Sequence, residues 1–159
     1  MDAATLTAIV DRHAPGLTLY ARQWSTAPED IVQEAFVKLA LQKTIPEPLV
    51  PWLYRVVRNG ALATARSQQR RAKHESRAAG QQPTWFTASE ESALDAAAVA
   101  ESLRTLPAEQ REAITLHLWA GLGFAEVGEV MQCSASSAHR WYRAGLERLR
   151  ERLASCLKD

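Results

Sequence analysis

The chain has 159 residues, of which 47% are hydrophobic and 23% are charged, and its 19 Lys and Arg against 18 Asp and Glu leave a formal charge of +1. This usage excludes disorder of the whole chain, and we expect neither a membrane span of roughly 18 apolar residues nor a secretory signal. Two cysteines are too few for a disulfide framework, so we expect a reduced, cytoplasmic protein without a membrane anchor.

The first 75 residues are predicted to form one helical lobe, because Val, Ile and Thr never alternate as they do in strands. Two short helices are expected on either side of Pro15 and Gly16, since a proline ends or kinks a helix. A helix over about 27–42 follows. Three prolines then predict a loop over 43–51, and a long helix is expected from Trp52 to Glu75.

Residues 76–100 are predicted to link this lobe to a second one. Small and polar residues, Gly80 and Pro83 among them, open this segment and are typical of a linker. The pair Trp85-Phe86 is unusual in a spacer, so we expect it to dock on one of the lobes. Helical spacing resumes over 90–104.

The second lobe, 101–159, is predicted to contain a helix-turn-helix. A helix is expected from Pro107 to Gly121, with Ile114, Leu118 and Trp119 as its apolar positions. A short helix over 123–131, a tight turn and a longer helix over 134–153 follow. The residues off the apolar stripe of the last helix are candidates for reading a DNA major groove, namely Ser136, Ser137, His139, Arg140 and Arg143. A purely structural three-helix lobe is the simpler alternative.

Charge is distributed in blocks along the chain. Residues 51–80 sum to +6 and residues 136–159 to +3, whereas 1–50 sum to −2 and 81–135 to −6. Two basic segments separated by an acidic one suggest two local contacts with a polyanion. By charge alone, two solvated helix faces remain the favoured explanation.

No catalytic or metal-binding motif emerges from the sequence. His117, Cys133, His139 and Cys156 match no closed zinc spacing, and Cys133 is better explained as a small apolar residue of the turn. Phosphate loops and nucleophile motifs are not found. We therefore expect no enzyme activity, no metal and no cofactor.

Three motifs resemble the extracytoplasmic-function (ECF) sigma factors of bacterial RNA polymerase. PEDIVQEAFVKL (28–39) resembles the signature helix of that family, and WLYRVVRNGALATAR (52–66) is similar to the element that follows it. LPAEQREAITLHLWAGLGFAEVGEVMQCS (106–134) resembles the lobe that reads the −35 promoter element. The order and spacing of the three motifs indicate this family more specifically than any single motif does.

The resemblance implies roles for three sets of residues. Asp30, Gln33 and Glu34 would bind the clamp helices of the largest subunit of core polymerase. The helix after the proline-rich loop would engage the −10 region of promoter DNA through aromatic stacking and basic groups, with the residues Trp52, Arg55, Arg58, Asn59, Arg66, Arg70, Arg71 and Lys73. Trp52 and Tyr54 are alternatively core or capping residues. Residues 134–143 would read the −35 duplex.

The sequence also departs from the family pattern. Pro48-Leu49 stands where the family usually has Ser-x-Phe, in the loop that holds a flipped −10 base, and Ala63 replaces an Asp. Gln132 occupies the usual glycine of the turn and is expected to adopt a left-handed conformation, which costs roughly 1 kcal/mol. His139 and its neighbours are bulkier than the common pattern, so an unusual −35 sequence is expected.

The sequence therefore predicts an all-α, two-lobe transcription initiation factor, with core polymerase, promoter DNA and an anti-sigma factor as partners. A first alternative is a helix-turn-helix regulator that acts without polymerase, which leaves the motifs at 28–39 and 52–66 unexplained. A second alternative is a sigma-like decoy that binds an anti-sigma protein and directs no transcription.

Overall fold

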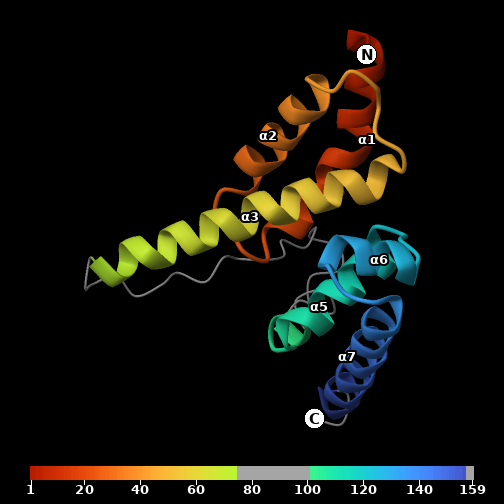
Figure 1. Cartoon of the computed structure of the whole chain (residues 1–159). Coiled ribbons are helices and arrows are strands. Elements are labelled where there is room, and N and C mark those ends of the chain that lie inside the picture. Colours follow the sequence, from red (N-terminus) through yellow and green to blue (C-terminus); the bar gives the residue numbers. More distant parts are fainter. Residues whose placement is uncertain (75–100, 157–159) are drawn as a thin grey trace. The chain divides into compact units, whose positions relative to one another are not determined.

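The computed structural model describes residues 1–74 and 101–156, and the chain separates into two compact units, Met1–Thr84 and Trp85–Asp159 (Figure 1). In the described ranges every regular element is a helix, which confirms the all-α, two-lobe prediction. The expected linker, 76–100, and the Trp85-Phe86 pair lie outside the described residues.

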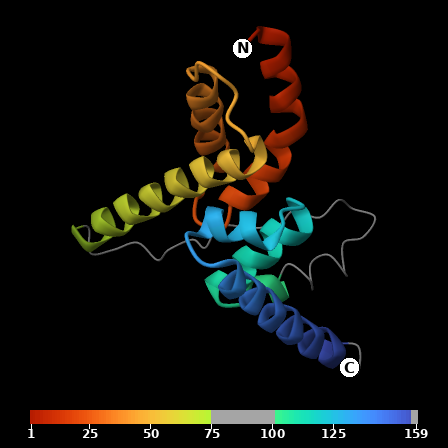
Figure 2. The ribbon, with the colours of Figure 1, turned by 45° about the vertical axis from the view of Figure 1, so that its right-hand side comes forward.

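The first unit consists of two helices packed on the first half of a third. These are α1 (Ala3–Ala21), α2 (Pro28–Ala40) and α3 (Leu49–His74). Leu17, Leu39, Leu53 and Val57 are completely buried and form the core between them. The second half of α3 extends past both other helices in either view (Figures 1 and 2).

The prediction that a break at Pro15 divides the first helix is wrong, because α1 runs through Pro15 without interruption. A proline inside a helix costs about 3 kcal/mol. Burial of Leu17 and Tyr20, both fully inaccessible, offsets that cost at about 2 kcal/mol for each side chain. Gly16 lets α3 approach closely, since a Cβ there would lie 2.9 Å from the hydroxyl oxygen of Tyr54.

The third helix begins at Leu49 instead of Trp52. Pro51 is tolerated there because the N–H groups of a first helical turn have no intrahelical acceptor. Tyr54 is a core residue, as one of the alternatives predicted: it is 5% exposed, and its ring meets the ring of Tyr20 edge-on with centroids 5.1 Å apart. Burial raises the pKa of Tyr54 to about 12.

The second unit is built around its longest helix. Its described elements are a helical turn over 101–104, α5 (Ala108–Ile114), the π-helical segment η2 (Thr115–Trp119), α6 (Phe124–Met131) and α7 (Ala135–Cys156). α7 packs against both α5 and α6. Leu103, Leu106 and Ile114 form a buried cluster, and Tyr142 and Leu149 of α7 pack on it, as the apolar stripe of α7 predicted.

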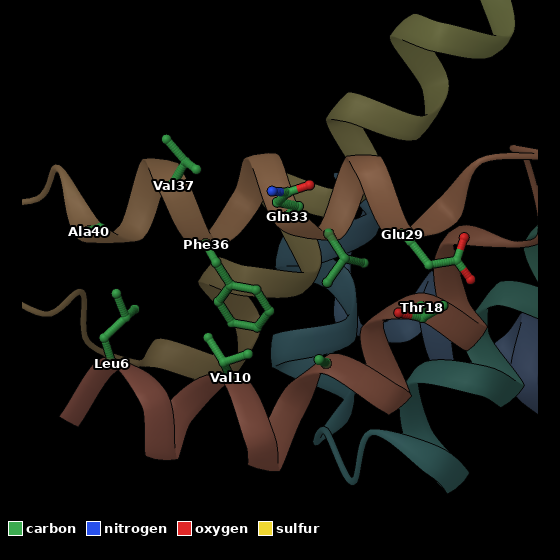
Figure 3. A pocket seen from close by; sticks show the side chains of 10 residues that line it. Leu6, Val10, Thr18, Glu29, Gln33, Phe36, Val37 and Ala40 are labelled. Atoms are coloured by element: carbon green, nitrogen blue, oxygen red, sulfur yellow. The ribbon is translucent and has the colours of Figure 1, made fainter. Parts of the chain in front are cut away.

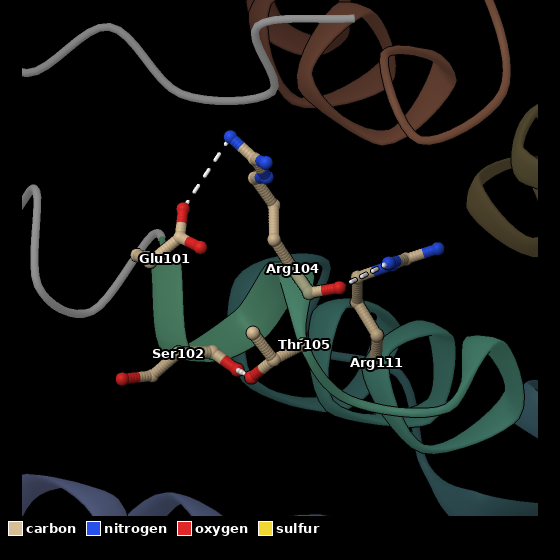
Figure 4. Close-up of polar contacts among 5 residues, drawn as sticks. All are labelled: Glu101, Ser102, Arg104, Thr105 and Arg111. Atoms are coloured by element: carbon tan, nitrogen blue, oxygen red, sulfur yellow. Dashed lines mark hydrogen bonds and ion pairs between the residues drawn. The ribbon is translucent and has the colours of Figure 1, made fainter. Parts of the chain in front are cut away.

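Polar contacts fix the turn that leads into α5 (Figure 4). The Thr105 hydroxyl donates to the Ser102 carbonyl over 2.7 Å, and the Arg111 guanidinium donates to the Arg104 carbonyl over 3.3 Å. Arg104 also forms an ion pair with Glu101 at 3.3 Å. These contacts satisfy backbone carbonyls between two helical segments, so Leu103 and Leu106 are held in the core.

The helix expected from Pro107 to Gly121 changes type halfway. Ala120 donates its N–H to the Thr115 carbonyl five residues earlier, which adds one residue to that turn. Leu118 and Trp119, two of the apolar positions expected in this helix, are 53% and 49% exposed, whereas Ile114 is completely buried. Gly121, at φ 70°, ends the segment.

Candidate nucleic-acid interface

A tight turn joins α6 to α7. Gln132 has φ 59° and ψ 46°, which confirms the predicted left-handed conformation. Gly128 allows the returning chain to approach, because a Cβ there would lie 2.7 Å from the Cys133 carbonyl oxygen. The two helices thus have the short, closely packed connection of a helix-turn-helix.

The first two to three turns of α7 present most of its predicted DNA-reading residues to solvent. Ser136, His139, Arg140 and Arg143 are exposed, whereas Ser137 is half-buried. The backbone N–H of Ser137 donates to the Ser134 hydroxyl oxygen over 3.1 Å, and the two hydroxyl groups are 3.0 Å apart. Ser137 therefore contributes to the cap of α7.

Aromatic rings surround the start of α6. The Phe124 ring stacks on the His117 imidazole, with centroids 4.3 Å apart and 16° between the planes. Tyr142 meets the His117 ring edge-on at 4.7 Å, and the His139 ring meets Phe124 edge-on at 4.8 Å. The histidines considered as zinc ligands thus share an aromatic neighbour, and no group of three metal-binding side chains occurs in 1–74 or 101–156.

The predicted −10 residues of α3 form a stripe along the helix. At 100° per residue, six of the eight fall within about 60° of one another around the axis: Trp52, Arg55, Asn59, Arg66, Arg70 and Lys73. Arg58 lies beside this stripe, and Arg71 lies about 100° from Arg70. Trp52 and Arg58 are half-buried, and the other six residues are exposed. The described surface of α3 thus combines one half-buried aromatic ring with a row of cations.

The predicted polymerase-binding residues Asp30, Gln33 and Glu34 lie exposed on α2. The Glu34 carboxylate forms an ion pair with Lys38 at 3.2 Å, and both side chains remain largely in solvent. Gln33 also borders a groove of about 410 Å³ between α1 and α2. In Figure 3 the side chains of Val10 and Phe36 point toward each other across this groove.

Sequence reasoning missed this groove. Its lining is mainly apolar and consists of Leu6, Val10, Ala14, Thr18, Glu29, Val32, Gln33, Phe36, Val37 and Ala40. Val37 is 52% exposed, and Leu41 beyond it is 77% exposed. A signal was available, because these two large apolar residues are spaced i, i+4 on a face other than the buried stripe.

Comparisons with known proteins decide the family. The model of sigma-70 region 2 matches residues 9–71, and the model of sigma-70 region 4 matches residues 96–149, so that together they cover well over half of the chain. The chain belongs to the sigma-70 family. It is a transcription initiation sigma factor, which is not an enzyme.

Two solved structures resemble this sigma factor. One is the sigma factor RpoE in complex with the anti-sigma factor NepR from Bartonella quintana, with 20% identity, a TM-score of 0.76, and coverage of 93% of this chain and 96% of that chain. The other is CnrH in complex with the cytosolic domain of CnrY, with 25% identity, a TM-score of 0.67, and coverage of 97% and 90%. No curated protein matches the sequence. In 1–74 and 101–156 no helix has the combination of length and hydropathy that a membrane-spanning segment needs.

Proposed function

We propose that this sigma factor binds core RNA polymerase through α2 and directs it, in the cytoplasm, to promoters that α7 and α3 recognise. The observation that carries the proposal is the exposed set His139, Arg140 and Arg143 at the start of α7, directly after a left-handed turn. A helix placed in this way is able to insert its first turns into a major groove.

The −35 duplex is the ligand assigned to α7. Arginine donates two parallel hydrogen bonds to the O6 and N7 atoms of guanine, a contact worth about 1–3 kcal/mol of discrimination. Arg140 and Arg143 are exposed, and so are Ser136 and His139, which offer shorter hydrogen-bonding groups. The hydroxyl group of Ser137 is engaged in the cap of α7, so we assign it a supporting role.

The −10 region is the ligand assigned to α3. Its row of cations suits the phosphates of a separated strand, and an aromatic ring at the start of that row suits a stacked base. Trp52 is half-buried, so part of its side chain remains accessible to a base. Arg66, Arg70 and Lys73 extend the row along the second half of α3.

Core polymerase is the partner assigned to the exposed face of α2. Asp30 and Glu34 are one helical turn apart and present two carboxylates on the same side, which suits a basic helical partner such as the clamp helices of the largest subunit. Gln33 stands beside them at the edge of the groove. The proposed polymerase interface on α2 therefore combines two carboxylates with the apolar surface of the neighbouring groove.

An anti-sigma factor is the second protein partner that we propose. Both solved relatives are bound to a protein, NepR in one case and CnrY in the other. The groove between α1 and α2 supplies an apolar surface that a partner helix can fill, and Gln33 borders both this groove and the polymerase-binding face. A partner bound there competes with polymerase.

Binding to purified core polymerase tests the α2 assignment. Asp30→Ala with Glu34→Ala should weaken binding at least tenfold in a titration with labelled sigma factor, because two exposed charges at an interface are removed. Glu129→Ala, which removes an exposed carboxylate from α6, is the matched control and should bind normally. Equal affinity of the double variant and the wild type would remove α2 from the interface.

The same preparation separates the two alternative functions. A regulator that acts without polymerase binds promoter duplex alone and gains no specificity when core polymerase is added. A decoy binds its anti-sigma partner and yields no promoter-dependent transcript. The match of region 2 to residues 9–71 supports the initiation factor over the first alternative.

A further inference from the structure

Phe124 connects the interior of the second unit to the DNA-reading face of α7. It is the first residue of α6 and is half-buried. One contact of its ring is with His117, and another is with the exposed His139 on α7. The Phe124 ring thus links the exposed His139 to the packed interior of the second unit.

The side chain of His117 is held in one orientation. Its Nδ1 atom lies 2.7 Å from the Leu122 carbonyl oxygen. A carbonyl oxygen only accepts, so Nδ1 carries a proton and donates it to Leu122. This bond fixes the imidazole plane on which the Phe124 ring stacks.

A third ring closes the cluster around Phe124. Tyr142 lies 4.7 Å from the His117 ring and 5.3 Å from the Phe124 ring, with 58° between the planes of Phe124 and Tyr142. Phe124 is therefore confined by two rings whose own positions are set by the core. Its remaining edge-on contact, at 4.8 Å and 80°, is with His139.

We propose that Phe124 is a positioning residue, which holds the His139 imidazole in the orientation that reads one base pair of the −35 duplex. The proposal rests on the proposed function of α7. A neutral imidazole has one donor and one acceptor, and its orientation decides which of them faces a base edge. An exposed side chain otherwise samples several rotamers, and holding one of them before binding reduces the ordering cost.

Base preference at each position of the −35 element is the decisive measurement. The full-length sigma factor, assembled with core polymerase, is incubated with a duplex library randomised over that element, and bound sequences are counted. His139→Ala should reduce the preference at one base pair by about fivefold or more. Phe124→Leu should reduce the preference at that same base pair, and the variant carrying both changes should match His139→Ala alone.

Two further variants separate positioning from structural support. Phe124→Tyr keeps the ring and should retain the wild-type profile. Glu129→Ala changes an exposed residue of the same helix and should also leave the profile unchanged. A uniform loss of binding to all sequences in Phe124→Leu, with the preferences of the remaining complexes intact, would overturn the proposal.

Ring-proton NMR of the free protein provides a second measurement. The edge-on contact predicts that the His139 ring protons sense the Phe124 ring current, so Phe124→Leu should shift them. Unchanged His139 resonances in Phe124→Leu would show that the ring does not hold the imidazole. If instead His139→Ala and Arg140→Ala both leave the base preferences intact, the assignment of α7 to the −35 element fails, which is a different result from failure of the Phe124 proposal alone.

Discussion

The two long basic helices of this sigma factor are supported in different ways. The buried residues of α3 all lie between Pro51 and Ala61, and in 62–74 none is buried. Every residue in 68–74 is exposed, whereas α7 packs against α5 and α6 and has half-buried leucines along its second half, Leu146, Leu149 and Leu153. The start of α7 is also capped by Ser134 and contacts the aromatic cluster through His139.

This difference fits two kinds of DNA contact. A phosphate attracts a cation from a range of directions, so a long arginine on a solvated helix is sufficient, and such contacts carry no sequence information. A base edge requires donors and acceptors at defined positions, which a packed and capped helix provides. We therefore expect changes in α7 to alter sequence preference and changes late in α3 to alter salt-dependent affinity.

Loss of the tight turn should have the largest effect. In Gly128→Ala the new Cβ meets the Cys133 carbonyl oxygen at 2.7 Å, and the backbone has to move. We expect the second unit to lose about 3 kcal/mol of unfolding free energy, as for other overpacked sites. Amide hydrogen exchange resolves the loss to the second unit and should leave the first unit unchanged.

Gly123→Ala is the matched control, because its nearest neighbour, a Glu126 carboxylate oxygen, would be 3.7 Å away. That substitution should cost less than Gly128→Ala. Equal losses would mean that the close approach at Gly128 does not define the turn.

High pH should destabilise the first unit through the buried part of α3. The pKa of Tyr54 is raised from 10.0 to about 12 in the folded protein, so the unfolded chain loses the proton first. The contribution of protonated Tyr54 to the free energy of unfolding is fully present below pH 10. It is lost as pH rises toward 12, and the maximum loss is about 3 kcal/mol. Urea unfolding below and above pH 10 measures this decrease in the free energy of unfolding. The decrease should be smaller in Tyr54→Phe, which has no hydroxyl group to titrate. An identical pH dependence in both proteins would contradict the assignment.

Arg140→Ala should relax specificity at one or two base pairs of the −35 element by about 1–3 kcal/mol. Arg148→Ala is the control on the same helix, since it removes an exposed arginine two turns further along α7. Competition between duplexes that differ at one position gives the discrimination directly. A specificity loss as large in Arg148→Ala would show that the start of α7 has no special role.

Arg70→Ala should produce the smallest effect, and it should be uniform across sequences. Loss of one phosphate contact to a separated strand should lower the slope of log affinity against log salt by about 0.7. Arg71 lies about 100° away around the helix, outside the stripe of Arg55, Arg66 and Arg70, so Arg71→Ala should change the slope less. A larger change in Arg71→Ala would mean that DNA contacts another face of α3.

Much of this architecture could be predicted from sequence, because helical periodicity reports which positions are buried. The stripe of α7 was predicted in this way and is confirmed, and the left-handed Gln132, expected from its place at the usual turn glycine of the family, is confirmed as well. Pro15 was misjudged because a local rule says nothing of how strongly Leu17 and Tyr20 are buried by other helices. The π-helical turn over 115–119 and the exposure of Leu118 and Trp119 are two features that the apolar spacing does not indicate.

The candidate site was predictable to a different degree in each part. The exposed cations of α3 and α7 follow from their positions off the apolar stripes. The groove between α1 and α2 arises from two helices together, and so do the contacts that join Phe124 to His117 and His139. No single segment of sequence contains such tertiary arrangements.

Reconstituted transcription tests the central claim most directly. Core polymerase is incubated with a genomic promoter library, with and without the full-length protein, and the transcripts are mapped to their start sites. We expect a discrete set of start sites that depends on the protein, and we expect Arg140→Ala to change the sequence preference of that set. Formation of a stable complex with polymerase that ignores every promoter offered would contradict it.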